Sequence, residues 1–219
     1  MIIYYFPDIE RIDEEKINAL VGWMPEQQQR IIGAMKLPRH KAEQAVAYTM
    51  LCYAIEKAQQ TILSPTLSIE EFEEKNHDIG LGKMELPIFE FGEHGKPSMI
   101  NHKGIYFNIS HCREAVAIGV YCREIGIDVE GRRKFSETLV RRSFNDEERE
   151  AILSAEIPEK EFARQWTRKE AWFKWTGTGI LLEHMQTTAA DAINAGCTIT
   201  TVEVNPPTSG KEFFLSIAV

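Results

Sequence analysis

Long apolar runs are absent from this chain. No stretch of its 219 residues approaches the roughly 20 apolar residues that a membrane-spanning helix needs. The opening residues, MIIYYFPDIE, lack the basic region and the long apolar core of a signal peptide. These absences argue against membrane insertion and export, so we expect a soluble, cytoplasmic protein without a membrane partner.

Cysteine is scarce, and its spacing forms no framework. Cys52, Cys112, Cys122 and Cys197 include no CxxC pair and lie within apolar patterns. In a chain that is not exported, this favours buried reduced thiols over disulfides or a zinc site. The six histidines are scattered, and His111 beside Cys112 is the only adjacent pair. A metal role for that pair is the less favoured alternative.

Broad positive charge is missing as well. The formal net charge is −8, from 33 acidic and 25 basic residues. Nucleic-acid-binding proteins neutralise phosphates with extended Lys and Arg surfaces, so nucleic acid is not expected as the main partner. Positive charge is local instead. One cluster, called the basic segment below, consists of Arg132, Arg133, Lys134, Arg141 and Arg142.

What is present is the composition of an ordinary globular protein, with 43% hydrophobic and 26% charged residues. Periodicity and turn signals predict strands at 2–6, 88–91, 105–110, 115–121, 125–130, 198–204 and 213–219. They predict helices after an Asp13 cap, at 25–35, 39–60 and 137–144, after a cap at 145 or 146, and at 159–175. Residues 64–86 are charged and interrupted by Gly and Pro, so we expect a loop there with one short helical turn.

Each half of the chain therefore runs strand, helices, strands. This order predicts an α+β fold of two similar lobes, residues 1–121 and 122–219, joined near Tyr121 to Glu124. The inference rests on the order of the elements, because no residue-level repeat is visible.

Two carboxylates interrupt the apolar strand pattern GIDVE. Asp128 and Glu130 lie two residues apart, so a strand places both on one face, while Ile127 and Val129 point the other way. Neighbouring carboxylates in a buried strand repel each other and lose hydration, so we expect a cation between them. The alternative is an edge strand whose acidic face meets solvent.

The segment WTRKEAWFKWTG predicts a second polar cluster on a helix. Glu170 and Lys174 lie one helical turn apart, and Trp166 and Phe173 suggest that this surface packs inward. Glu170 would add a third oxygen ligand for Mg²⁺, and an inward Lys174 would need an anion such as a phosphate. An exposed Glu–Lys pair is the alternative interpretation.

Four motifs occur along the chain in the order GKP at 95–97, FNISH at 107–111, GIDVE at 126–130 and WTRKEAWFK at 166–174, which Gly177 follows. In this order they resemble the 4′-phosphopantetheinyl transferase family of the surfactin-synthetase-activator type. Any one motif is a weak signal, but four at the expected spacing are specific. They span residues 95–179, and the length and element order fit the rest of the chain.

The resemblance implies two pseudo-symmetric α/β lobes with coenzyme A bound in the cleft between them. It also implies transfer of 4′-phosphopantetheine from coenzyme A to a serine of an apo acyl or peptidyl carrier protein. Asp128, Glu130 and Glu170 would hold Mg²⁺ against the pyrophosphate of coenzyme A. Lys174 would stabilise the charge on the phosphate that is transferred, and Glu170 would also be catalytic.

The remaining assignments also come from the resemblance. Lys96, Ser110 and His111 would position the nucleotide phosphates, and Arg30 matches a further basic position. Glu148 resembles a glutamate of the family that would act as a base, a looser match. A carboxylate or a metal-bound water would accept the proton of the serine hydroxyl.

The chain departs from the family at the first long helix. The family usually carries an Arg there that contacts the 3′-phosphate of coenzyme A, whereas this chain has Val46 and Ala47, and Gln27 replaces a frequent Lys. Arg39 and Lys41, at the start of the helix, are candidates to supply the missing charge.

The resemblance also implies an acidic carrier protein, and this chain is itself acidic. We therefore expect the basic segment to flank the docking surface of the carrier. Two other functions remain open at the sequence level. A Mg²⁺-dependent nuclease or phosphodiesterase would also use clustered carboxylates and a Lys, although on a different spacing. A non-catalytic module that binds coenzyme A or a carrier would not need all three carboxylates and Lys174.

Overall fold

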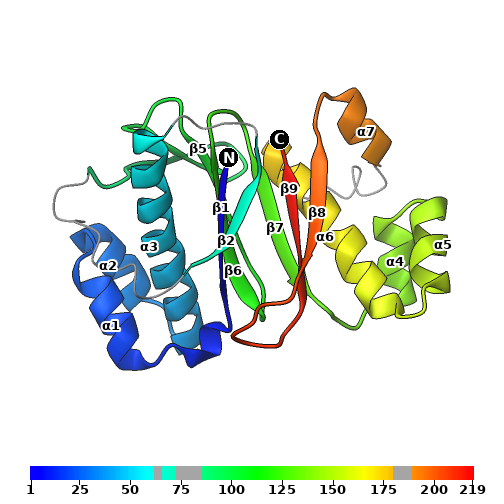
Figure 1. Cartoon of the computed structure of the whole chain (residues 1–219), viewed down its shortest axis with the longest axis horizontal. Helices are drawn as coiled ribbons and strands as arrows, with labels where there is room; N and C mark the ends of the chain where they lie inside the picture. Colours follow the sequence, from blue (N-terminus) through cyan, green and yellow to red (C-terminus); the bar gives the residue numbers. More distant parts are fainter. Residues whose placement is uncertain (62–65, 73–84, 180–188) are drawn as a thin grey trace.

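The computed structural model describes residues 1–61, 66–72, 85–179 and 189–219. Two sheets face each other between helices (Figure 1). The strands are β1 (Ile2–Pro7), β2 (Ser68–Glu71), β3 (Phe89–Phe91), β4 (Pro97–Met99), β5 (Tyr106–His111), β6 (Ala115–Tyr121), β7 (Gly126–Gly131), β8 (Ile199–Val204) and β9 (Phe213–Ala218). The helices are α1 (Glu14–Gly22), α2 (Glu26–Gly33), α3 (Pro38–Gln60), α4 (Glu137–Ser143), α5 (Asp146–Ser154), α6 (Pro158–Thr176) and α7 (Ala189–Asn194), with a 3-10 turn at Ile9–Arg11.

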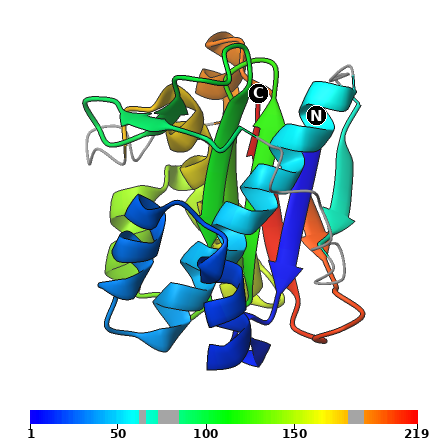
Figure 2. The same cartoon turned by 90° about the vertical axis from the view of Figure 1, so that its left-hand side faces the viewer.

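One sheet has the strand order β2-β1-β6-β5, and α3 lies across it (Figure 2). The other sheet has the order β7-β9-β8 and packs against α6. A small hairpin of β3 and β4 stands apart from both sheets. Within the described residues no helix is both long and apolar enough to cross a membrane. The α+β class expected from the sequence is confirmed.

Strand β1 shows how the layers form. All six of its residues are buried, because alternate side chains enter two different cores. Ile2, Tyr4 and Phe6 pack toward α3, whereas Ile3 and Tyr5 enter the core between the two sheets. An unbroken apolar run, rather than an alternating one, is the pattern of a strand that is covered on both faces.

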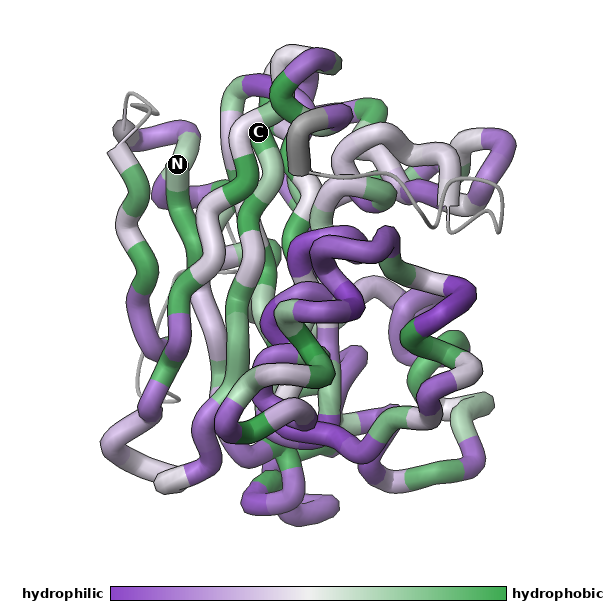
Figure 3. Tube along the Cα trace, turned by 90° about the vertical axis from the view of Figure 1, so that its right-hand side faces the viewer, coloured by the Kyte–Doolittle hydropathy of each residue, from purple (hydrophilic) through white to green (hydrophobic). Residues whose placement is uncertain are grey.

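The core between the sheets takes residues from both predicted lobes. Ile3 and Ala117 come from the first sheet, and Ile127, Leu215 and Ile217 come from the second. Because this core is shared, it marks no boundary between the lobes, and the division into residues 1–121 and 122–219 stays a prediction. On the far side of α6, helices α4 and α5 pack around Phe144 and Phe162, and much of the hydrophilic sequence on that side lies on helices (Figure 3).

Three expectations need correction. Within the predicted loop 64–86, residues 68–71 form β2, which pairs in parallel with β1. This short edge strand is stabilised by tertiary contacts, since Ile69 packs on the inter-sheet core and Tyr5 donates a hydrogen bond to Glu71. The expected helical turn falls partly on 62–65 and 73–84, outside the described residues, and the described parts of the segment contain none.

Helix α7 was not expected, and Cys122 is exposed rather than buried, unlike the other three free thiols.

The free edges of the two sheets meet where β5 runs beside β7. The side chain of Asn108 accepts a hydrogen bond from the backbone N–H of Ile127 at 2.9 Å. The Ser110 hydroxyl accepts one from the N–H of Val129 at 3.3 Å. Two buried side chains thus satisfy backbone donors that a neighbouring strand would otherwise satisfy.

Helix α6 approaches β7 most closely at Gly126. A Cβ atom there would lie 2.0 Å from the carbonyl oxygen of Ala171 and 2.4 Å from the amide nitrogen of Trp175. Both are backbone atoms of the helix, so only a residue without a side chain permits this contact.

We therefore predict that Gly126→Ala lowers the free energy of unfolding by about 3 kcal/mol or more, because helix and strand must separate. Urea denaturation measures the change. Gly33→Ala is the matched control, since nothing lies within 4 Å of its Cβ position and Ala is the better helix former. Equal stabilities for the two variants would contradict the packing described here.

Candidate active site

Asp128 lies at the centre of a buried polar cluster between β5, β7 and α6. Its carboxylate Oδ1 accepts a hydrogen bond from the Ser110 hydroxyl at 2.7 Å and one from Lys174 Nζ at 2.7 Å. Lys174 also donates to the Ser110 hydroxyl at 2.9 Å. Asp128 is 5% exposed. The buried carboxylate therefore has a cation and a hydroxyl as partners, as its burial requires.

The local sequence explains this geometry. Ile127 and Val129 enter the inter-sheet core, so the alternation of β7 turns Asp128 and Glu130 toward α6 and β5. On α6, Glu170 and Lys174 share a face one turn apart. Gly177, with a φ of 72°, ends the helix just beyond Lys174. The structure thus brings Asp128 of the strand into contact with Lys174 of the helix.

Glu130 and Glu170 extend the cluster, and both have raised pKa values. Burial, followed by repulsion from Asp128, raises the pKa of Glu170 to about 7. Burial also raises the pKa of Glu130, against the opposing effect of Arg133, whose guanidinium lies 3.0 Å from its carboxylate. Burial thus shifts both pKa values most, and the like charge of Asp128 adds to its effect. Lys174 and Arg133 balance part of the negative charge.

A divalent cation suits the chemistry of these donors. The carboxylates of Asp128, Glu130 and Glu170 offer the hard oxygen atoms that Mg²⁺ prefers. In this arrangement, however, the described residues contain no group of three or more His, Cys, Asp or Glu side chains close enough together to ligate one ion. Lys174 instead contacts Asp128, and Arg133 contacts Glu130.

A cavity of about 300 Å³ opens beside the cluster. Glu170 and Lys174 line it from α6, Asn108 from β5, and Lys96 from the turn before β4. Lys96 donates to Glu124 at 2.7 Å and to the carbonyl oxygen of Trp175 at 3.1 Å. The cavity therefore has two lysines and one carboxylate in its wall, a combination suited to a phosphorylated ligand.

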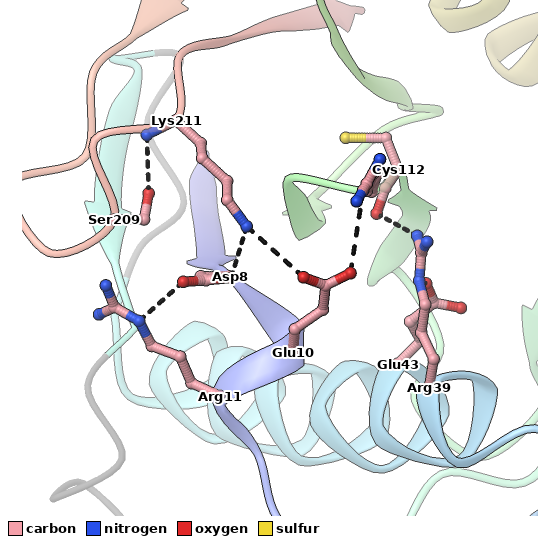
Figure 4. Close-up of polar contacts among 9 residues, drawn as sticks. Asp8, Glu10, Arg11, Arg39, Glu43, Cys112, Ser209 and Lys211 are labelled. Atoms are coloured by element: carbon pink, nitrogen blue, oxygen red, sulfur yellow. Dashed lines mark hydrogen bonds and ion pairs between the residues drawn. The ribbon is translucent and has the colours of Figure 1, made fainter.

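His111 points to the other side of β5. Its Nδ1 lies 3.6 Å from the carboxylate of Glu43 on α3. Glu43 also accepts a hydrogen bond from Arg39, which donates a second one to the carbonyl oxygen of Cys112 (Figure 4). We did not single out Glu43 from the sequence. The available signal was an acidic residue on the apolar face of a helix, four positions after Arg39.

Other predicted site residues lie elsewhere. Arg30 pairs with Glu26 on the exposed surface of α2. Val46 and Ala47 are buried in the core beneath α3. The carboxylate of Glu148 bonds to the N–H of Asn145, as part of the cap of α5, and pairs with Lys169 at 2.8 Å. Its role as a base stays a prediction.

The basic segment is exposed at all five positions. Within the described ranges, Arg133 and Arg141 have partners. Arg133 pairs with Glu130 and stacks over Phe162 and Trp166, and Arg141 pairs with Glu137.

Comparison with known proteins points to one family. Residues 124–212 match the sequence profile of the 4′-phosphopantetheinyl transferase superfamily. The matched segment contains Asp128, Glu130, Glu170 and Lys174. Through this segment, the chain is similar to that superfamily.

Curated relatives agree with this assignment. The chain is 35% identical over 106 residues to the 4′-phosphopantetheinyl transferase psf-1 of Bacillus pumilus, covering 48% of this chain and 46% of that protein. It is 40% identical over 100 residues to HetI of Nostoc sp., covering 42% of each chain. It is 31% identical over 96 residues to Sfp of Bacillus subtilis, covering 43% of each chain. The matched part is thus less than half the length of each of these relatives.

The raised pKa of Glu170 predicts a pH effect on stability in metal-free buffer with a chelator. Because the folded state holds this proton up to about pH 7, against an ordinary value of 4.5, the free energy of unfolding falls as pH rises between these values. Glu170→Gln removes this contribution, which amounts to at most about 3 kcal/mol. The variant should therefore gain stability over the parent as pH rises from 4.5 to 7.

Urea denaturation at several pH values measures this difference. Glu150→Gln, at an exposed position on α5, is the control and should follow the parent. A constant difference between Glu170→Gln and the parent across this range would contradict a Glu170 pKa near neutrality.

Proposed function

We propose that the chain transfers 4′-phosphopantetheine from coenzyme A to a serine of an apo acyl or peptidyl carrier protein, cleaving the pyrophosphate bond and releasing adenosine 3′,5′-bisphosphate. The observation that carries this proposal is the placement of Lys174. It contacts Asp128 and Ser110 and at the same time lines the cavity that Lys96 and Glu170 also line. A cation fixed by a buried carboxylate beside an open cavity is suited to hold a phosphate that undergoes transfer.

The carboxylates would hold the metal of this reaction. Asp128, Glu130 and Glu170 are the residues that would bind Mg²⁺, which when bound supplies charge neutralisation at the pyrophosphate. Lys174 holds the transferred phosphate and stabilises the charge that develops on it. Lys96 and Ser110 orient the neighbouring phosphates from the cavity wall and the end of β5.

The serine hydroxyl must lose its proton during transfer. Glu170 is the better placed of the two candidate carboxylates, because it lines the cavity beside Lys174. Glu148 already accepts a backbone hydrogen bond and pairs with the buried Lys169. We therefore favour Glu170, or a water molecule that it orients, as the acceptor.

The two alternative functions receive less support. In a nuclease of the kind considered above, the lysine follows a carboxylate on a strand, whereas Lys174 comes from a helix. A non-catalytic binding module would not need Glu130 and Glu170, whose pKa values are raised by burial first and by neighbouring carboxylates second. Buried carboxylates with raised pKa values lower the stability of a fold and are typical of catalytic sites.

The test is incubation with coenzyme A, Mg²⁺ and a panel of apo carrier proteins, followed by intact-protein mass spectrometry. We expect a carrier to gain the mass of one phosphopantetheine group. Coenzyme A binding without any mass gain would favour the non-catalytic module, and cleavage of nucleic acid or a phosphodiester would favour the alternative hydrolase.

We predict that Lys174→Gln lowers kcat by about 10²–10³-fold, because it removes the charge that meets the transferred phosphate. A discontinuous assay of carrier modification measures kcat. Lys160→Gln, on the same helix but paired with Glu203 and Glu212, is the control and should keep the parental rate. A parental kcat in Lys174→Gln would remove the main support for this mechanism.

The basic segment is our proposed docking site for an acidic carrier. Charge reversal at Arg132 and Arg142, two exposed members, should raise the KM for the carrier about tenfold while leaving the affinity for coenzyme A unchanged. Steady-state kinetics and calorimetry separate the two effects. The control reverses Lys36 and Lys103, which are exposed elsewhere. Equal KM values in both double variants would show that the segment is only a solvated surface.

A further inference from the structure

A second cavity, of about 610 Å³, lies between the two sheets. Both chain termini lie at this end of the sheets (Figure 1). Ile217 lines the cavity and pairs with Ile127, whose side chain points away from that of Asp128. Among the described residues, this cavity shares no lining residue with the one beside Lys174. It is therefore separate from the site of the proposed transfer reaction.

The cavity forms where the apolar filling between the sheets stops. Along β8, Val204 and Val202 pack into the inter-sheet core, whereas the next residue on that face, Thr200, is exposed and lines the cavity. Tyr121 and Ile217 form part of the cavity wall and are only 2% and 1% exposed. The floor is thus the open end of the inter-sheet core rather than a patch on the outer surface.

The wall is mainly apolar. Its apolar residues are Met1, Leu67, Tyr121, Trp175, Ile217 and Val219. Only two of these six carry rings, so the wall suits an aliphatic body better than a flat aromatic one. A cavity of this volume with an apolar floor and a few polar groups at its rim is typical of a small-molecule site.

The rim carries a positive charge. Arg123 Nη2 donates to the Tyr121 hydroxyl at 3.1 Å, and the guanidinium lies 5.5 Å from the centre of that ring. Within the described ranges Arg123 forms no ion pair, whereas the neighbouring Glu124 pairs with Lys96 at 2.7 Å. Because Glu124 is neutralised and Arg123 is not, the rim favours a ligand with an anionic head.

Lys96 connects this cavity with the one beside Lys174. It lines the cavity beside Lys174, yet its two hydrogen-bond partners, Glu124 and the carbonyl oxygen of Trp175, belong to residues that line the cavity between the sheets. A phosphate that attracts Lys96 draws it away from Glu124. The carboxylate of Glu124 then stands unneutralised beside Arg123 and repels an anionic head there.

We propose that the cavity between the sheets binds a monocarboxylic acid with an aliphatic body, such as a medium-chain fatty acid, and that this ligand and coenzyme A weaken each other's binding through Lys96. The carboxylate pairs with Arg123, and the aliphatic chain packs on Ile217 and Leu67. The binding site stands on its own residues, whereas the link to coenzyme A rests on the proposed function.

The test of the site is calorimetric titration of the full chain with octanoate, and with 1-octanol as the uncharged ligand with the same chain. We expect octanoate to bind with a Kd of about 0.1 mM and 1-octanol to bind about tenfold more weakly, since only the carboxylate pairs with Arg123.

Two variants locate the ligand. Arg123→Gln should raise the Kd for octanoate about tenfold and leave that for 1-octanol unchanged. Arg113→Gln, at an exposed position beyond the other end of β6, is the matched control. Thr200→Trp fills the cavity from an exposed strand position and should abolish binding of both ligands, with circular dichroism as the check that the variant is folded.

The link is tested in both directions. Saturating coenzyme A should raise the Kd for octanoate about threefold, and saturating octanoate should raise the Kd for coenzyme A by the same factor. Lys96→Gln should raise the Kd for octanoate about threefold without any coenzyme A, because it leaves Glu124 unneutralised.

The outcomes separate this inference from the proposed function. A parent chain that binds no octanoate, or equal octanoate affinities in Arg123→Gln and Arg113→Gln, would overturn the site while leaving the transfer reaction intact. An octanoate Kd that responds neither to coenzyme A nor to Lys96→Gln would overturn the link. A parent chain that binds octanoate but neither binds coenzyme A nor modifies a carrier would overturn the proposed function and support the site.

Discussion

The burial of Asp128 is the constraint on which the rest of the site depends. An ionised carboxylate that is 5% exposed needs partners, and it obtains them from two further elements, Ser110 on β5 and Lys174 on α6. The same Ser110 hydroxyl accepts the N–H of Val129. One carboxylate thus links the edges of both sheets to the long helix, and the close approach of α6 to Gly126 fixes the distance at which this can occur.

Charge balance accommodates the carboxylates of this cluster. Lys174 contacts Asp128, and Arg133 contacts Glu130. Arg133 is held over the rings of Phe162 and Trp166, at 5.6 and 5.5 Å, so its pairing with Glu130 is supported by packing as well as by charge. A divalent cation held by these carboxylates would therefore have to replace two internal ion pairs.

The sequence predicted the features that depend on local periodicity and missed those that depend on tertiary contacts. Alternation in GIDVE gave the common face of Asp128 and Glu130, and helical spacing gave that of Glu170 and Lys174. Strand β2 was missed because Ser68–Glu71 is polar and becomes a strand only by pairing with β1. The Glu43 pairing was missed because His111 is far from it in the chain, and no local pattern indicates that the end of β5 reaches α3.

The departure at Val46 and Ala47 follows from where these residues lie. Both side chains are 3% exposed on the core-facing side of α3. An arginine at either position would have to bury its charge among apolar side chains. Arg39 lies in the first turn of the same helix, where its side chain still reaches solvent. The unbonded N–H groups of that turn also favour an anion. A basic side chain at the start of α3 therefore reaches solvent without disturbing the core, and Glu43 restricts its orientation.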